Sequence, residues 1–312
     1  MGDEKVIALL LMQQIAVLFL IMGLGFLIVK LGIVKTEDSR VLSMVTIYLV
    51  LPCVTIHAFQ IEYSTKIRNG FLLAVAVAIL IHVVLFVVCG ILRKLLKMDE
   101  VETASLIYSN AGNLILPLVT SILGEEWVIY ASGFLCVQTI LVWTHGQSLM
   151  QGQRQVNLKK IVQNINLIAI LTGLVFFLCN IHLPEIIDSM TSSLAGMIGP
   201  ISMVMIGMLL AGVDWKLVFG KRRIYGIVFL KMIVVPGIIT LCLKLAAPLI
   251  PMENAKTILL ISLLAVIAPT AVTITQMAQL YKRDAAYASS INVFTTLVCI
   301  VTMPLMVMLY MI

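Results

Sequence analysis

Ten apolar runs of about 20 residues each, the length that an α-helix needs to cross a bilayer, occupy most of this chain of 312 residues. They extend near residues 6–29, 38–59, 71–92, 103–123, 127–150, 164–182, 189–212, 224–249, 257–280 and 286–311. Hydrophobic residues make up 61% of the chain and charged residues only 12%, so too little polar sequence remains for a separate soluble domain. The sequence therefore predicts an all-α membrane protein with ten transmembrane helices.

The basic residues predict how these helices are oriented. Loops that follow odd-numbered runs hold 15 of the 21 Lys and Arg residues, namely Lys30, Lys35, Arg40, Arg93, Lys94, Lys97, Arg154, Lys159, Lys160, Lys216, Lys221, Arg222, Arg223, Lys282 and Arg283. Loops on the other side hold Lys5, Lys66, Arg68, Lys244 and Lys256. Because cytoplasmic loops carry the excess of basic residues, we expect both termini outside and the 5–6 loop in the cytoplasm. The net charge of +6 then follows from topology and does not indicate nucleic acid.

Ten helices divide into two five-helix halves, residues 1–150 and 164–312, joined by a loop at 151–163. An odd number of helices per half makes the second half inverted, which is typical of secondary transporters. A short echo agrees with this division, since Tyr130-Ala131-Ser132 recurs as Tyr287-Ala288-Ser289 at an offset of 157. We therefore expect two inverted repeats.

Two runs contain residues that interrupt helices. The fourth contains Asn110, Gly112, Asn113 and Pro117, and the ninth contains Pro269, which the same offset aligns with Gly112. Proline removes a backbone hydrogen bond and clashes with the preceding turn, while Asn and Gly weaken a helix further. Paired breaks at mid-membrane must face protein or a cavity and mark a substrate site. The alternative is a simple proline kink in each helix.

Polar side chains around these breaks are the candidate substrate-binding residues: Asn110, Asn113, Gln138, Thr270, Thr273 and Gln276. Amide groups can donate hydrogen bonds to a carboxylate, and the N-terminal end of a half-helix favours negative charge. The alternative is that these side chains bond freed backbone carbonyls or neighbouring helices. Gly112, Pro117, Pro269 and Lys231 are predicted to shape the crossover itself.

Lys231 lies about seven residues inside the eighth run, where a charge is costly. Three alternatives stay open for it: the side chain extends to the cytoplasmic face, bonds backbone carbonyls at the crossover, or balances the charge of an anion. No Asp or Glu lies near the middle of any run, so the sequence shows no carboxylate site for a coupling proton or sodium ion. His57, His82 and His145 are expected to be structural.

Several function classes lack their motifs in this sequence. The six cysteines are scattered without CxxC or Cys/His spacing, so no metal and no cofactor are expected. GxSxG, HExxH and GxxxxGK[ST] are absent, which argues against an enzyme or a primary pump. A secondary transporter for a small organic anion is the leading hypothesis. The alternatives are an ion-coupled symporter of another substrate class and a non-transporting membrane sensor.

Four segments carry a resemblance to a known family: Leu42 to Pro52 with Tyr48, Asn110 seven residues before Pro117, Lys231 five residues before Pro236, and Pro269 followed by a polar helix ending Gln279-Leu280-Tyr281. In this order they resemble the auxin efflux carrier family, which includes plant auxin carriers and bacterial malate-permease-like members. Gln138 matches a glutamine that looks substrate-facing in the plant carriers. The short loop at 151–163 is similar to that of the bacterial members.

The resemblance implies a fold similar to bile-acid/sodium symporters, with helices 4 and 9 crossing at their breaks. Helices 1, 2, 6 and 7 would form a scaffold, and helices 3–5 and 8–10 a transport domain that moves like an elevator. It further implies a permease or efflux carrier for malate or another carboxylate in the bacterial cytoplasmic membrane. A proton or a sodium ion as coupling ion, and a homodimer, stay open.

Overall fold

A computed structural model describes residues 2–152, 162–213 and 215–311 of the chain, and within these ranges it is helical apart from one isolated β bridge. The first half contains α1 (Gly2–Lys30), η1 (Thr36–Asp38), α2 (Ser39–Val45), η2 (Thr46–Val50), α3 (Leu51–Ala58), α4 (Thr65–Leu96), α5 (Glu100–Ile107), α6 (Ala111–Leu123), η3 (Glu125–Trp127), α7 (Val128–Leu141), η4 (Val142–Gly146) and α8 (Gln147–Gln151). The second half contains α10 (Ile165–Leu178), α11 (Glu185–Ala195), α12 (Ile198–Ala211), α13 (Trp215–Gly220), α14 (Arg222–Phe229), η5 (Leu230–Val234), α15 (Val235–Ala246), η6 (Ala247–Leu249), α16 (Ala255–Ile267), α17 (Val272–Leu280) and α18 (Ala285–Met311).

Seven helical segments within the described ranges are long and apolar enough to cross a membrane. They comprise Gln13–Lys30, Thr36–Ala58, Thr65–Leu96, Glu125–Gln151, Glu185–Ala211, Arg222–Leu249 and Ala285–Met311. Three shorter apolar helices, α6, α10 and α16, lie in the predicted fourth, sixth and ninth spans. The fourth and ninth spans are each divided into two helices, so the count of ten spans stays a prediction. Most of the predicted 5–6 loop, with Arg154, Lys159 and Lys160, lies outside the described residues.

The outer helices show apolar side chains on their free faces. α4 exposes Leu72, Leu80 and Val87, each more than half accessible, while Ala74 and Ala78 on its other face are buried. Exposed apolar surface on this scale would be unfavourable in water and is what a lipid-facing helix needs. The pattern agrees with a helix that packs on one side and meets lipid on the other.

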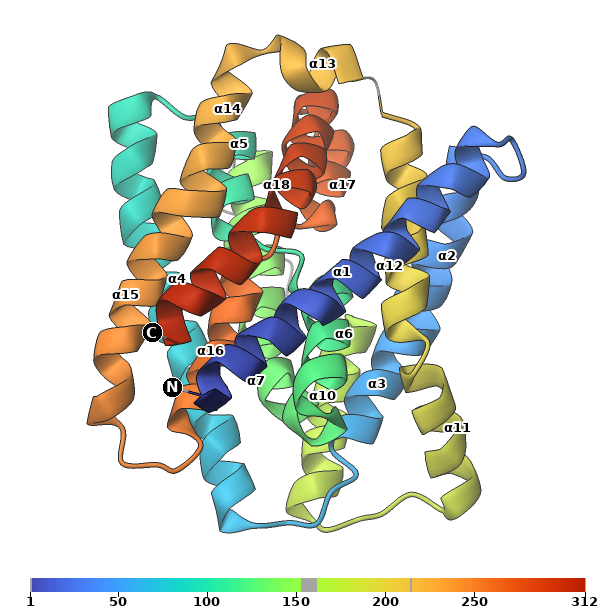
Figure 1. Cartoon of the computed structure of the whole chain (residues 1–312), viewed down its shortest axis with the longest axis vertical. Coiled ribbons are helices and arrows are strands. Elements are labelled where there is room, and N and C mark those ends of the chain that lie inside the picture. Colours follow the sequence, from blue (N-terminus) through green and yellow to red (C-terminus); the bar gives the residue numbers. More distant parts are fainter. Residues whose placement is uncertain (1, 153–161, 214, 312) are drawn as a thin grey trace.

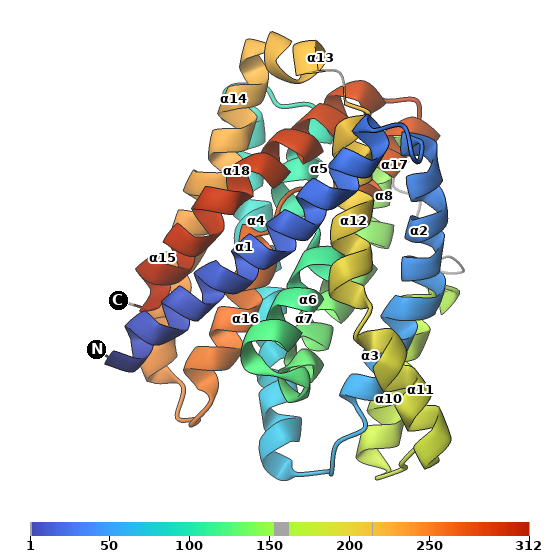
Figure 2. The ribbon, with the colours of Figure 1, turned by 45° about the vertical axis from the view of Figure 1, so that its right-hand side comes forward.

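The connections between helices gather at two opposite ends of the molecule (Figures 1 and 2). The connections after α1 and α4 lie at one end together with α13. The connections α3–α4, α10–α11 and α15–α16 lie at the other. The first end carries the basic loops, which is the arrangement that the charge count predicts.

Helices α1 and α12 cross at very short range, through two glycines. A Cβ atom on Gly207 would lie 1.9 Å from the carbonyl oxygen of Met22, and one on Gly25 would lie 2.3 Å from that of Val204. Only glycine lets two backbones approach this closely, as small residues do between membrane helices. These two glycines therefore fix the distance between the predicted first and seventh spans.

Candidate functional site

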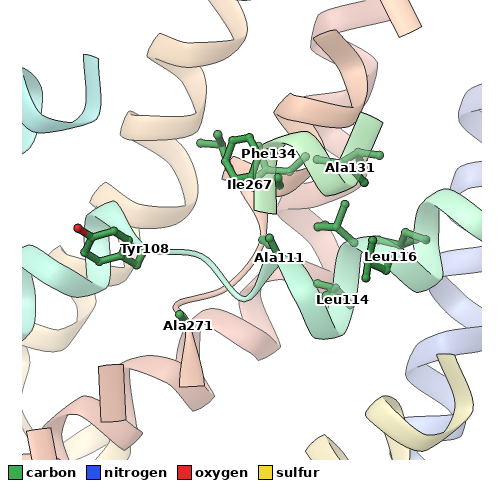
Figure 3. Packing of buried hydrophobic residues seen from close by; sticks show 14 of the residues in the cluster. Tyr108, Ala111, Leu114, Leu116, Ala131, Phe134, Ile267 and Ala271 are labelled. Atoms are coloured by element: carbon green, nitrogen blue, oxygen red, sulfur yellow. The ribbon is translucent and has the colours of Figure 1, made fainter. Parts of the chain in front are cut away.

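The two divided spans meet at their breaks near the centre of the molecule. Between α5 and α6, and between α16 and α17, the chain is extended, and the two extended segments lie side by side (Figure 3). The backbone N–H of Asn110 donates to the carbonyl of Pro269 at 2.8 Å, and that of Ala271 donates to the carbonyl of Tyr108 at 3.0 Å. Ser109 and Thr270 thus form an antiparallel bridge. The breaks are joined by backbone hydrogen bonds and do not merely touch.

Side chains from neighbouring helices satisfy the backbone groups that the breaks release. The Gln138 amide accepts from the N–H of Ser109 at 3.3 Å and donates to the carbonyl of the same residue at 2.9 Å. The hydroxyl of Thr295 accepts from the N–H of Thr270 at 3.2 Å, and the amide of Asn292 donates to its carbonyl at 2.5 Å. Non-helical backbone at membrane depth requires such partners.

A cavity of about 500 Å³ lies beside this crossing. It is lined by Ile47, Tyr48, Leu51, Thr55, Ser109, Asn110, Ala111, Gly112, Asn113, Leu135, Gln138, Thr139, Val142, Trp143, Gln163, Asn164, Ile165, Asn166, Ile170, Ala271, Thr273, Gln276 and Leu280. Both α6 and α17 begin at its wall, because Ala111 to Asn113 and Ala271 to Thr273 stand at their first turns. Two helix N-termini, each with partial positive charge, therefore face one space.

Five of the six predicted substrate-binding residues line the cavity, and Thr270 does not. Asn113 donates to the Asn110 side-chain oxygen at 3.2 Å, which leaves the Asn110 amide nitrogen without a partner among the described residues. Thr273 is half-buried and Gln276 is exposed. Gln138 bonds Ser109 through both its side-chain oxygen and its side-chain nitrogen, so it holds the crossing while contributing to the wall. Thr270 is fully buried, and its hydroxyl donates to the carbonyl of Ser105 at 3.1 Å.

The residues predicted to shape the crossover lie at or beside it. Gly112 lines the cavity, and Pro117 is buried inside α6, where Ser121 donates to its carbonyl at 2.7 Å. Lys231 does not extend to either face of the molecule. It is 1% exposed, lies in a π-helical turn, and donates to the carbonyl of Leu106 at 3.1 Å and the hydroxyl of Ser109 at 2.8 Å.

The sequence prediction missed several polar residues of the cavity wall, chiefly Ser109, Asn164, Asn166 and Trp143. Asn164 caps α10 by accepting from the N–H groups of Asn166 and Leu167, both at 3.1 Å. The signal was present as two asparagines at the start of the sixth run, which the sequence prediction did not consider. The buried side-chain oxygen of Asn166 has no hydrogen-bond partner within the described ranges.

We infer that the cavity opens at the end of the molecule that is predicted to be cytoplasmic, because three of its exposed lining residues lie there. Gln163, Gln276 and Leu280 on its rim are exposed, and they lie next to the predicted 5–6 and 9–10 loops. None of the lining residues, all of them within the described ranges, is Asp or Glu. Among the side chains that the structure describes, no group of three His, Cys, Asp or Glu residues could hold a metal ion.

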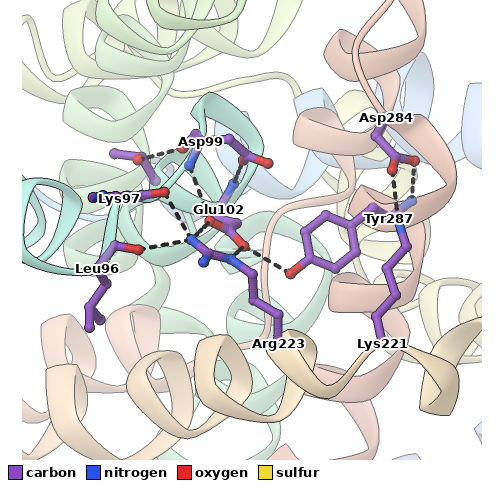
Figure 4. Close-up of polar contacts among 9 residues, drawn as sticks. Leu96, Lys97, Asp99, Glu102, Lys221, Arg223, Asp284 and Tyr287 are labelled. Carbon is purple, nitrogen blue, oxygen red and sulfur yellow. Dashed lines mark hydrogen bonds and ion pairs between the residues drawn. The ribbon is translucent and has the colours of Figure 1, made fainter.

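A second polar cluster joins α4, α5, α14 and α18 (Figure 4). The buried Glu102 carboxylate accepts from Arg223 at both of its oxygens, from the Tyr287 hydroxyl at 2.9 Å and from the N–H of Asp99 at 3.1 Å. Burial alone would raise the pKa of Glu102, but the hydrogen bonds from Arg223, Asp99 and Tyr287 outweigh burial and hold this pKa below its usual range. Beside it, Lys221 pairs with Asp284 at 2.9 Å.

Comparison with models of protein families gives a match to membrane transport protein over residues 10–164 and again over residues 153–307. The chain belongs to this family, the auxin efflux carrier family. A search of curated proteins gave no match. Membership makes the chain a membrane transport protein, in agreement with its apolar helices, and the family is one of transporters and not of enzymes.

Proposed function

We propose that this protein is a secondary transporter that moves a small organic anion, malate or another carboxylate, across the cell membrane. The observation that carries the proposal is the convergence of two half-helix N-termini and several amide side chains on one cavity without an acidic residue. Each helix terminus contributes roughly half a positive charge. The free amide nitrogen of Asn110, with Gln276 on the rim, adds donors for a carboxylate.

The position of the cavity suggests how transport would proceed. It lies between η2, α3 and α10 on one side and α6, α7 and α17 on the other. We assign the first group, with α1, α2, α11 and α12, to a scaffold, and the second group, with α4, α5 and α14 to α18, to a transport domain. In this proposal the halves are inverted repeats, the structure is open to the cytoplasm, and an elevator-like movement carries the substrate outward.

Uptake into proteoliposomes tests the substrate class directly. Labelled mono- and dicarboxylates are compared with neutral amides of the same shape, and proton and sodium gradients are varied separately. We expect carboxylates to compete for uptake at least tenfold better than amides, which corresponds to about 1.4 kcal/mol. Equal competition by a carboxylate and its amide would contradict an organic-anion site and leave only the fold.

The proposed orientation has its own test. Cysteines placed at Arg222 and Glu253 lie at opposite ends of the α14–α15 span. A membrane-impermeant thiol reagent should label position 222 only from the cytoplasm and position 253 only from outside. Labelling of both positions from the same side would rule out the proposed topology.

A further inference from the structure

The ammonium group of Lys231 is the least expected feature of the protein interior. It is buried in the α14–α15 span, and no carboxylate of the described residues forms an ion pair with it. A buried charge without an opposite charge is unfavourable unless several polar atoms surround it. Its partners are the carbonyl of Leu106 and the hydroxyl of Ser109.

One of those partners lies in the C-terminal turn of α5, and the other links Lys231 to the C-terminal turn of α16. Leu106 stands in the last turn of α5, where carbonyl groups lack helical partners. Ser109 accepts from Lys231 and donates its own proton to the carbonyl of Val266, in the last turn of α16, at 3.1 Å. The C-terminal end of a helix carries partial negative charge. One ammonium group therefore serves two negative helix ends, directly at α5 and through Ser109 at α16.

The crossing thus separates charge between its two sides. The positive N-termini of α6 and α17 face the cavity, and the negative C-termini of α5 and α16 face Lys231. In carriers with broken helices, carbonyls at such C-terminal ends are the ligands for a coupling cation. Here a covalently attached cation already contacts them.

From this geometry we infer that Lys231 is a resident cation that takes the place of an inorganic coupling cation, so that the carrier works without sodium. The claim that the carrier works without sodium rests on the proposed transport function. The claim that Lys231 occupies a cation site does not. Ser109 both lines the cavity wall and accepts a hydrogen bond from Lys231, so one residue links the resident cation to the substrate space.

Thermal unfolding of the purified protein tests the structural part. Sodium, potassium and ammonium chlorides are each compared with N-methylglucamine chloride at constant ionic strength. The wild-type midpoint should be the same in all four salts. Lys231→Ala vacates the site, so its midpoint should be lower and should rise by several degrees, saturably, with at least one small cation. Lys231→Met fills the space without charge and should be destabilised in every salt.

The control is Lys244→Ala, which removes an exposed lysine from α15 and should show no cation response. A wild-type midpoint that rises with sodium, or a Lys231→Ala protein that ignores all three cations, would overturn the inference. If Lys231→Ala cannot be purified, the wild type and a Lys231→Arg variant decide, because both should be insensitive to the cation.

Carboxylate uptake by the wild type should proceed equally in sodium and N-methylglucamine. Failure of uptake in every salt, with the unfolding pattern intact, would refute the transport proposal and leave the role of Lys231 standing.

Discussion

The His57 ring nitrogen Nε2 lies 3.2 Å from a carboxylate oxygen of Glu125, and Nδ1 of the same ring lies 2.9 Å from Asp188. His57 in α3 and Asp188 in α11 belong to the proposed scaffold, whereas Glu125 follows α6 in the proposed transport domain. The contact stands at the end of the molecule opposite the cavity opening. It would therefore have to break when the carrier opens to the outside.

Glu125→Gln should weaken this contact and shift the carrier toward an outward-open state. A partly exposed ion pair contributes about 0.2–1 kcal/mol, so external labelling of Thr139→Cys in the cavity wall should accelerate by up to about fivefold. The six native cysteines are first replaced. The neighbouring Glu126→Gln, which has no contact with His57, serves as control and should leave the rate unchanged. Equal rates in both variants would argue against a gate at Glu125.

Gln276→Glu should weaken carboxylate binding, because it places a negative charge on the rim of a cavity that has none. Two like charges about 4 Å apart repel by about 1 kcal/mol in water and by more near protein, so KM for a carboxylate should rise five- to tenfold or more. Gln279→Glu adds the same charge to an exposed position of α17 outside the cavity wall. A similar rise in KM for both variants would indicate a general surface effect.

Gly207→Ala should destabilise the protein, because the added methyl group meets the backbone of Met22 in α1. Overpacking of this kind costs about 1–3 kcal/mol. The thermal unfolding midpoint in detergent should fall by several degrees. Gly23→Ala is the matched control in α1, since nothing lies within 4 Å of its added Cβ atom. An unchanged midpoint for Gly207→Ala would mean that the two helices separate without strain.

Glu102→Gln should lower stability by about 1–2 kcal/mol at neutral pH, since it removes charge-assisted hydrogen bonds to Arg223. The folded protein lowers the pKa of Glu102, so the stabilisation is present above the unfolded value and is lost as the pH falls through the folded one. The difference between the unfolding midpoints of wild type and variant should be constant from pH 7 to 5. It should decrease as the pH falls below about 4.5.

Glu100→Gln is the control for this prediction. Glu100 is half-buried, and its contacts to Arg93 at 3.5 Å and Arg283 at 3.8 Å are longer than those of Glu102. It should lose less stability than Glu102→Gln at every pH. A difference between wild type and Glu102→Gln that does not shrink at all as the pH falls below about 4.5 would show that the carboxylate charge is not what stabilises the cluster.

The positions of the two breaks could be predicted from residues alone. Asn110, Gly112 and Pro269 disfavour a continuous helix whatever surrounds them, so each break appears in the local sequence. The role of each polar side chain could not be predicted, because it depends on the partner that the fold supplies. Thr270 and Thr273 look alike in sequence, yet one is buried against Ser105 and the other lines the cavity.

Contacts between residues far apart in the sequence could not be predicted from the sequence either. Glu102 lies at the edge of an apolar run, and nothing near it in the sequence indicates Arg223 or Tyr287 as its partners. The sequence left three alternatives open for Lys231. Only its hydrogen bonds to Leu106 and Ser109 show which oxygens it contacts. Pairings of this kind follow from the tertiary arrangement and not from local pattern.

The backbone pairing between Asn110 and Pro269 also bears on how the protein is made. During synthesis the N-terminal half would enter the membrane first, carrying the N–H of Asn110 and the carbonyl of Tyr108, whose partners lie in the second half and cannot be replaced by lipid. Its partner segment emerges only when most of the second half has been translated. The crossing is therefore incomplete until the segment around Pro269 arrives, and we expect the two halves to assemble as one cooperative unit. A truncated first half should be held by the insertion machinery or degraded, and co-expression of the second half should rescue it.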